Sequence, residues 1–431
     1  MPRSLQQDHR DMAGLMLPLL ALFCLVQSGS ALPAKIENDA KSPELRHTDP
    51  EVTMKAPELI QHFGYPAEIV SVTTEDGYVL DMHRIPHGKG EIPNGCRPVV
   101  FMQHGLEADS TNWITNMPDQ SAGFMFADAG FDVWLGNVRG NPYGKAHTHL
   151  DPDHHSFWKF SWDEMTKDLE AQIDKVLEIT GQKSLYYIGH SQGTLTMFSK
   201  LSVDPAFAPK IKKFFALAPV GTVKNIKGMI KFLADWFLPV LDIWYDVFGT
   251  GEFLPNNWFM DLIAKFFCNG GIGEDLCDDV MFIICGPESS QFNKTRTPVY
   301  VGHVPAGTST QNIMHYAQMV KAGTVARFDY GSSKENQDHY GVSKPPSYDF
   351  ATIKTDMYLY WSDEDWIADA HDVKNYLLTT LNPNYVKQSN HMSEYNHLDY
   401  IWGLNAAAEI YKPIMKILTE DLGGSVKCPK V

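Results

Sequence analysis

The sequence predicts an α/β fold in which helices flank a mostly parallel central sheet. From about Pro98 onward, short β-rich runs alternate with helical patterns, and this alternation is typical of a parallel sheet covered by helices. One helical pattern covers residues 162–180, where apolar side chains recur at helical spacing. A chain of 431 residues, 44% hydrophobic and 20% charged, is long enough for one large domain with an insertion.

Six segments have the length and apolar character of strands. They are residues 98–102, 131–135, 185–188, 213–217, 357–361 and 385–388. The region from 222 to 348 interrupts the alternation, because it is rich in Trp, Phe, Gly and Pro. We therefore expect a cap and lid inserted at 222–348, between a first core part at 32–221 and a second at 349–431.

The N-terminus has the order of a secretory signal peptide. Two basic residues, Arg3 and Arg10, precede an apolar run at 15–26, which small residues follow up to Ala31. We expect residues 1–31 to be removed. A membrane anchor is the alternative, but the run is shorter than the roughly 20 apolar residues that span a bilayer. Because no later stretch is both long and uncharged, we expect no transmembrane segment in the mature chain.

Neither the charge nor the histidines of the sequence favour a nucleic-acid or metal partner. With 52 acidic and 36 basic residues, the formal net charge is −16, which disfavours nucleic acids and anionic membranes held by bulk electrostatics. The histidines at 147–155 are crowded on one loop without the spacing of zinc or calcium ligands. A solvated loop is the favoured interpretation, and we expect neither metal nor cofactor.

The cysteines and one sequon fit a chain that enters the secretory pathway. Removal of the signal leaves an odd number of cysteines where disulfides can form, so at least one thiol stays free or pairs between chains. They are Cys96, Cys268, Cys277, Cys285 and Cys428. Cys268 and Cys277 flank a glycine-rich loop and can approach each other, and Cys96 and Cys428 are a second candidate pair. Asn293 begins the N-glycosylation sequon Asn293-Lys294-Thr295.

A serine lies in the sequence context of a nucleophile elbow. The segment Gly189-His190-Ser191-Gln192-Gly193 follows the predicted strand 185–188 and precedes a helical pattern at 194–201. Its glycines let the chain turn sharply from strand to helix, which lifts the Ser191 hydroxyl to the carboxyl edge of the sheet. The motif alone is weak, and an ordinary turn is the alternative. The flanking strand and helix favour Ser191 as a nucleophile.

An acid and a base follow later strands of the predicted sheet. A serine hydroxyl needs a base to become reactive, and the base needs a carboxylate to fix its tautomer. The predicted strand 357–361 is followed by Ser362-Asp363-Glu364-Asp365, and a later strand leads to His397. Because both groups follow strands at the edge that carries Ser191, we expect one of these carboxylates and His397 to complete a catalytic triad.

Two backbone N–H groups are candidates for an oxyanion hole, which requires donors aimed at a developing negative charge. One belongs to Gln192, the residue after the nucleophile. The other belongs to the loop after the first predicted parallel strand, where His104-Gly105-Leu106 lies, and we assign it to Leu106. An ordinary turn at the end of a strand is the alternative for His104-Gly105.

These residues resemble the acid lipase family of gastric lipase and lysosomal acid lipase. The resemblance covers about residue 57 to the C-terminus and rests on ordered motifs. They are Gly64-Tyr65-Pro66, Glu75-Asp76-Gly77-Tyr78, Arg84-Ile85-Pro86, His104-Gly105-Leu106, Asn137-Val138-Arg139-Gly140, the segment 189–194, Pro305-Ala306-Gly307-Thr308-Ser309 and Asn396-His397-Leu398-Asp399. The resemblance implies the α/β-hydrolase fold with an inserted cap and a mobile lid near 251–282.

The resemblance also implies the roles of individual residues. It implies Ser191 as nucleophile, His397 as base, Leu106 and Gln192 as oxyanion donors, a Cys268–Cys277 disulfide, and Cys285 as a free thiol. The acid of the family lies in a segment ending in Leu-Ala-Asp, which aligns with 365–369 and points to Asp365. Asp363 and Glu364 stand where the family usually has glycines, which leaves Asp363 as a rival.

The predicted function is that of a serine lipase, a carboxylic ester hydrolase. We expect it to cleave neutral lipids, triacylglycerols or cholesteryl esters, through an acyl-enzyme at a lipid–water interface. The resemblance implies that the enzyme works at acidic pH in the lysosome, with secretion as the second location. A catalytically silent lipid carrier and a related phospholipase or thioesterase are the alternatives. The aromatic stretches 232–244 and 258–267 could be packed core, an acyl-chain site or a lipid-facing surface.

Overall fold

A large, mostly parallel sheet with helices on both faces confirms the predicted α/β class. The computed structural model describes residues 49–91, 95–228, 231, 251–253, 285–287 and 289–427, all within the second of the two compact units of the chain, Asp49–Val431. The predicted signal peptide, most of the predicted lid, both aromatic stretches, Cys268, Cys277 and Cys428 lie outside the described residues.

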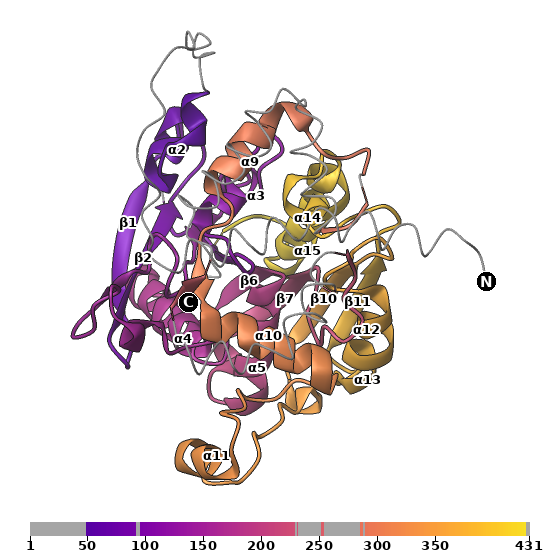
Figure 1. The fold of residues 1–431 in the computed structure, drawn as a ribbon. Coiled ribbons are helices and arrows are strands. Elements are labelled where there is room, and N and C mark those ends of the chain that lie inside the picture. The colour runs from indigo at the N-terminus through magenta and orange to yellow at the C-terminus, as the bar shows by residue number, and fades with distance from the viewer. Residues whose placement is uncertain are drawn as a thin grey trace, which may run out of the picture. The chain divides into compact units, whose positions relative to one another are not determined.

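The main sheet has nine strands in the order β1-β2-β4-β3-β6-β7-β10-β11, with β5 paired to β2 (Figure 1). From β4 to β11 in that order, every neighbouring pair is parallel, whereas β2 is antiparallel to β1, β4 and β5. A second, two-stranded sheet joins β8 and β9. The strands are β1 Glu68–Thr73, β2 Tyr78–Ile85, β3 Val99–Gln103, β4 Asp132–Leu135, β5 Ala146–His147, β6 Leu185–His190, β7 Ile211–Leu217, β8 Glu252–Phe253, β9 Thr308–Ser309, β10 Asp356–Trp361 and β11 Val386–His391.

Helices cover both faces of this sheet: α3, α14 and α15 lie on one face, and α4 and α5 lie on the other (Figure 1). The α-helices are α2 Ala56–His62, α3 Ala122–Asp128, α4 Met165–Thr180, α5 Gln192–Val203, α9 Thr297–His303, α10 Thr310–Ala322, α11 Ser333–Tyr340, α12 Ala370–Asp372, α13 Leu378–Thr380, α14 Asp399–Trp402 and α15 Lys412–Asp421. Short 3₁₀ helices are η1 Pro50–Val52, η2 Ser110–Trp113, η3 His155–Trp158, η4 Ala208–Lys210, η6 Lys294–Arg296 and η7 Phe350–Thr352, and π-helical turns are η8 Val373–Leu377 and η9 Ala407–Tyr411.

The six predicted strands are confirmed as β3, β4, β6, β7, β10 and β11, each within three residues of its predicted ends. The central ones are buried on both sides, since every residue of β3, β4 and β6 is buried, as continuous apolar runs in a parallel sheet require. The predicted helical pattern 162–180 forms α4, which buries Met165, Leu169, Ile173 and Val176 against the sheet and ends at Gly181 in the left-handed conformation, with φ of 66°.

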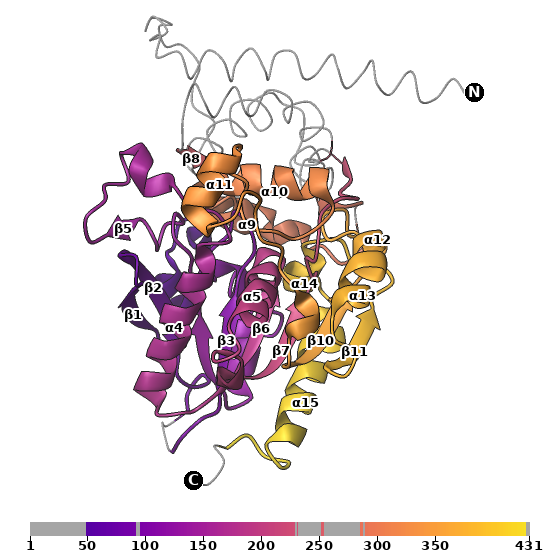
Figure 2. The ribbon, with the colours of Figure 1, turned by 90° about the horizontal axis from the view of Figure 1, so that it is seen from below.

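A long insertion separates β7 from β10, although these strands are neighbours in the sheet. Its described part carries β8, α9, β9, α10 and α11, and we call residues 218–355 the β7–β10 insertion. In Figure 2, α9 and α10 lie across one end of the sheet, above the strands. Hydrogen bonds join this insertion to Glu107, in the loop after β3, and to Gln192, the first residue of α5 after β6, and they identify that end as the carboxyl edge. The insertion therefore lies over the edge at which the predicted catalytic residues meet.

Candidate active site

Ser191 lies in a sharp turn between β6 and α5. Its φ is 52°, in the left-handed region that non-glycine residues rarely adopt, and its N–H donates to the carbonyl of Leu217 at 3.0 Å. The glycine at 193 is required by close packing, because a Cβ there would lie 2.6 Å from the carbonyl oxygen of Gln103. Only 5% of Ser191 is exposed. The strained turn therefore holds the hydroxyl at the end of a central strand, which is the geometry of a nucleophile elbow.

The structure joins Ser191, His397 and Asp365 in one chain of hydrogen bonds. Ser191 Oγ lies 2.7 Å from His397 Nε2, and His397 Nδ1 lies 2.9 and 3.0 Å from the two carboxylate oxygens of Asp365. All three residues are buried. Because a carboxylate only accepts, Nδ1 carries the proton and Nε2 is left as the acceptor for the serine hydroxyl. This arrangement can generate a serine nucleophile.

Asp365 rather than Asp363 contacts the imidazole. Asp365 is fully buried, and its Oδ1 also accepts from the N–H groups of Ile367 and Ala368 at 2.9 and 2.8 Å. The side chain of Asp363 is half exposed and lies 2.8 Å from Lys374 Nζ. The hydrogen bond from Lys374 lowers the pKa of Asp363. The rival carboxylate thus belongs to a surface ion pair.

Two groups to which the sequence analysis gave no part in the triad hold the loop of His397. The carbonyl oxygen of Cys285 accepts from the N–H of His397 at 3.1 Å and from the N–H of Trp366 at 3.4 Å, so it bridges the loops of base and acid. Cys285 itself is a free, buried thiol, and burial raises its pKa. His190 Nε2 lies 2.9 Å from the carbonyl oxygen of His397. This contact links the nucleophile elbow directly to the base.

His190 and Asp399 are buried titratable groups beside the triad. Burial, and then the proximity of His397, lowers the pKa of His190 well below its ordinary value, so its ring is neutral and its Nε2–H donates to the carbonyl of His397. Burial raises the pKa of Asp399 to about 6. Its Oδ2 accepts from the N–H of Asn396 at 2.8 Å. Both groups shape the turn that presents His397.

The loop that contains Leu106 packs directly on the nucleophile elbow. A Cβ on Gly105 would lie 3.0 Å from Cβ of Ser191, so this close approach favours glycine. Leu106 follows in the loop after β3, and Gln192 is the first residue of α5. The N–H of neither residue is a donor in the backbone hydrogen bonds of the described loops. Gln192 follows Ser191 directly and Leu106 follows Gly105, which packs on Ser191, so both remain candidate oxyanion donors.

A buried polar network supports that loop from below. His104 Nε2 lies 3.2 Å from Asn141 Nδ2, and Asn141 Nδ2 also donates to Asn137 Oδ1 at 3.0 Å. Asn137 Oδ1 accepts from the N–H of Ser110 at 2.9 Å. Burial lowers the pKa of His104 to about 4, so the neutral ring accepts from Asn141 at Nε2. The segment 137–141 thereby fixes both ends of the loop.

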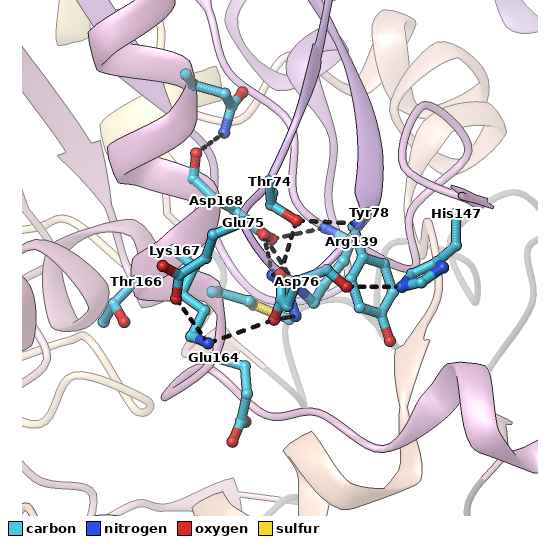
Figure 3. Close-up of polar contacts among 12 residues, drawn as sticks. Thr74, Glu75, Asp76, Tyr78, Arg139, His147, Glu164, Thr166, Lys167 and Asp168 are labelled. Carbon is cyan, nitrogen blue, oxygen red and sulfur yellow. Dashed lines mark hydrogen bonds and ion pairs between the residues drawn. The ribbon is translucent and has the colours of Figure 1, made fainter. Parts of the chain in front are cut away.

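Arg139 anchors the same segment through two carboxylates (Figure 3). Its Nη1 lies 2.9 Å from Asp76, its Nη2 lies 2.6 Å from Asp168, and its guanidinium stacks 4.0 Å above the ring of Tyr78. The side chains of Arg139 and Asp168 are 1% and 0% exposed. Burial raises the pKa of Asp76, but Arg139 outweighs it and holds the value at about 2. The β1–β2 turn, α4 and the segment 137–141 are thus one charged unit.

The remaining predicted residues that the structure describes make contacts outside the hydrogen bonds of the triad. Asn293 Oδ1 accepts from the N–H and hydroxyl of Thr295 at 3.2 and 2.7 Å within the sequon. Cys96 is disulfide-bonded, and its partner lies outside the described residues, because the other described cysteine is free. His147 Nε2 lies 2.8 Å from the carbonyl oxygen of Asp76. Over the part of the chain that the structure describes, no three His, Cys, Asp or Glu side chains are grouped as metal ligands.

No helix among the described residues combines the length and the apolar character needed to cross a bilayer.

Comparisons with known proteins identify the fold of the chain. Residues 56–117 match the model of a partial alpha/beta-hydrolase lipase region, and residues 98–245 match the model of the alpha/beta hydrolase fold. A crystal structure from Sulfolobus solfataricus shares the fold with a TM-score of 0.50 at 14% identity, over 82% of this chain and 99% of the other. That likeness concerns the fold alone.

Curated relatives cover nearly the whole chain. The chain is 60% identical to lipase lipl-5 of Caenorhabditis elegans over 88% of its own length and 95% of the relative. It is 44% identical to human gastric triacylglycerol lipase, over 88% and 94% of the two chains. It is 43% identical to lysosomal acid lipase/cholesteryl ester hydrolase of Macaca fascicularis, over 89% and 95%. The chain therefore belongs to the acid lipase family, within the α/β-hydrolase fold, and is a lipase, a hydrolase that acts on esters.

Proposed function

We propose that this lipase hydrolyses neutral lipid esters, triacylglycerols or cholesteryl esters, through an acyl-enzyme on Ser191. The observation that carries the proposal is the hydrogen-bonded chain from Ser191 Oγ through His397 to Asp365. The names of two relatives, a triacylglycerol lipase and a cholesteryl ester hydrolase, support the substrate class. An ester carbonyl is the electrophile that a buried serine alkoxide attacks.

The proposed reaction has two stages. Ser191 Oγ attacks the carbonyl carbon while His397 Nε2 takes the hydroxyl proton, and the N–H groups of Leu106 and Gln192 bind the oxyanion. His397 then returns the proton to the leaving alcohol, and Asp365 stabilises the imidazolium in between. Water, activated by the same imidazole, attacks the acyl-enzyme and releases the fatty acid. No metal or cofactor enters the scheme.

We further propose that the protein works at acidic pH, in the lysosome or outside the cell, with the lysosome favoured. The order of residues 1–31 supports a signal peptide that is removed. Asn293 is the proposed glycosylation site, and Cys268 and Cys277 are the proposed disulfide. Residues 222–348 are the proposed cap and lid.

A substrate panel tests the proposal. The secreted protein and its Ser191→Ala variant are assayed on triacylglycerol, cholesteryl ester and phospholipid emulsions at pH 4.5 and 7.5. We expect hydrolysis of a neutral lipid, faster at pH 4.5, and its loss in the variant. Preference for the phospholipid would contradict the substrate class. Lipid binding with no hydrolysis by either form would instead identify a silent carrier.

A further inference from the structure

One segment of the β7–β10 insertion contacts Gln192, one proposed donor of the oxyanion hole, and Glu107, the residue that follows the other proposed donor, Leu106. Residues 306–312 cross the carboxyl edge of the sheet, and three hydrogen bonds join them to Glu107 and Gln192. We propose that Asn312 and Glu107 are positioning residues that lock the two donors to this segment. The inference rests on the proposed function, because it assigns Leu106 and Gln192 as the donors. It assigns the insertion a part in holding the catalytic geometry, besides covering the site.

Asn312 holds the side chain of Gln192. Asn312 Nδ2 donates to Gln192 Oε1 at 2.8 Å, and the two residues are 0% and 2% exposed. The amide of Asn312 has a defined orientation, because its Oδ1 accepts from the N–H of Trp162 at 2.8 Å. Gln192 Nε2 lies 3.3 Å from the sulfur of Met165. Both atoms of the side-chain amide of Gln192 are therefore held, which restrains the residue that carries the proposed N–H donor.

Glu107 is held in a conformation that it would not adopt by itself. Its φ is 55°, in the left-handed region, which a residue with a side chain occupies only when its surroundings enforce it. The carbonyl oxygen of Glu107 accepts from the N–H of Ala306 at 2.7 Å, and its Oε2 accepts from the N–H of Gly307 at 2.9 Å. Because Glu107 follows Leu106, these bonds fix the chain immediately after the second donor.

The segment that makes these contacts is itself fixed. Ser309 Oγ caps α10 by accepting from the N–H of Asn312 at 3.0 Å, and the Ser309 hydroxyl donates to the carbonyl of Phe160. The N–H of Thr310 donates to the carbonyl of Gly251 at 2.9 Å. A Cβ on Gly307 would lie 2.9 Å from a carboxylate oxygen of Glu252. The segment 306–312 is therefore held in place by its own helix cap and by close packing, independently of its contacts to Glu107 and Gln192.

A double-mutant cycle tests the Asn312 arm. Asn312→Ala, Gln192→Ala and the double variant are assayed on p-nitrophenyl butyrate, and phosphonylation of Ser191 by an aryl phosphonate is timed in parallel. Gln192→Ala keeps the backbone donor but removes the side chain that Asn312 holds. We expect each single variant to lose between about tenfold and a hundredfold in kcat and in phosphonylation rate, with KM within about twofold. The double variant should be no slower than the slower single variant.

A matched buried asparagine controls for damage to the insertion. Asn336 of α11 is 3% exposed, donates to Asp329 at 2.9 Å and accepts from the N–H of Tyr330 at 3.1 Å, away from the triad. Asn336→Ala should lower the melting temperature about as much as Asn312→Ala while leaving kcat unchanged. Equal losses of kcat in the two variants, or losses that multiply in the cycle, would overturn the positioning role of Asn312.

Three variants of one residue test the Glu107 arm. Glu107→Gln keeps an oxygen that can accept from Gly307, so its kcat should stay within about threefold of the parent. Glu107→Ala loses that anchor, and Glu107→Gly loses it while relieving the left-handed backbone. We expect kcat to fall in both. Full activity of Glu107→Gly would show that only the backbone conformation matters and would contradict the assignment.

Ser191→Ala distinguishes failure of the proposed function from failure of the positioning inference. If it keeps esterase activity, the proposed function fails. If it is inactive while the Asn312 and Glu107 variants have unchanged kcat, the positioning inference alone fails.

Discussion

At the scale of the residue, the environment of each carboxylate decides its part in the site. Asp363 and Asp365 lie two positions apart in one acidic loop, and the sequence analysis pointed to Asp365 as the acid with Asp363 as its rival. Burial and two backbone donors hold Asp365 on His397, whereas Asp363 pairs with Lys374 at the surface. The position after a strand identifies the loop that carries the acid, and the folded environment identifies Asp365 within that loop.

Matched substitutions of these two residues give the first prediction. Asp365→Asn should lower kcat by roughly 10³- to 10⁴-fold, because an amide in place of the carboxylate no longer fixes the tautomer of His397. Asp363→Asn should stay within about threefold, since exposed ion pairs contribute little. Ester hydrolysis at saturating substrate measures both. A larger loss for Asp363→Asn would reassign the acid.

Asp399 gives a prediction on pH-dependent stability. Its pKa is about 6 in the folded protein against 3.8 in an unfolded chain, so the folded state holds the proton more tightly. Below about pH 4 Asp399 is protonated in both the folded and the unfolded state, so it contributes nothing to the pH dependence of the free energy of unfolding. Between pH 4 and 6 the unfolded state ionises first, and the free energy of unfolding should fall by up to about 3 kcal/mol.

Asp399→Asn should remove that part of the pH dependence. Urea unfolding of both proteins at pH 4 and pH 6.5 measures it, with the parent losing more stability than the variant on going to the higher pH. Parallel curves for the two proteins would mean that Asp399 does not titrate in this range.

At the scale of the element, the charged unit around Arg139 connects the sheet edge to the site. The sequence analysis did not predict β1, because it is an edge strand without a buried face: none of its six residues is buried, and Ile69 is 58% exposed. Its turn nevertheless supplies Asp76 to Arg139 (Figure 3). The apolar pattern of β1 is too weak to reveal the strand, although the ion pair between Asp76 and Arg139 holds its turn in place.

Arg139→Met tests how much the buried ion pairs of Arg139 contribute to the free energy of unfolding. The substitution leaves the fully buried Asp168 without its partner, and loss of one member of a buried ion pair costs roughly 3–5 kcal/mol. Denaturant unfolding at pH 6 should show this loss. The control is Lys175→Met on α4, which breaks a pair with Glu178 whose side chains are 33% and 69% exposed and should change stability by less than about 0.5 kcal/mol. Similar losses in both variants would argue against a structural role for the buried unit.

At the scale of the whole molecule, the parallel order of the sheet explains how much the sequence could predict. Parallel central strands are buried on both faces, so they appear as continuous apolar runs that the sequence reveals. Because each such strand ends at the same edge, Ser191, Asp365 and His397 could be placed together from their positions after strands. No local sequence pattern revealed the hydrogen bonds of His190, Cys285 and Asn312, since these bonds depend on which loops meet above that edge.

Labelling of the active serine tests the central claim most directly. The protein is incubated with a p-nitrophenyl alkylphosphonate and digested, and the modified peptide is identified by mass spectrometry, alongside Ser191→Ala and His397→Ala. We predict a single adduct on Ser191, absent from Ser191→Ala and formed at least about a hundredfold more slowly in His397→Ala. An adduct on another residue, or equal labelling in His397→Ala, would contradict the account.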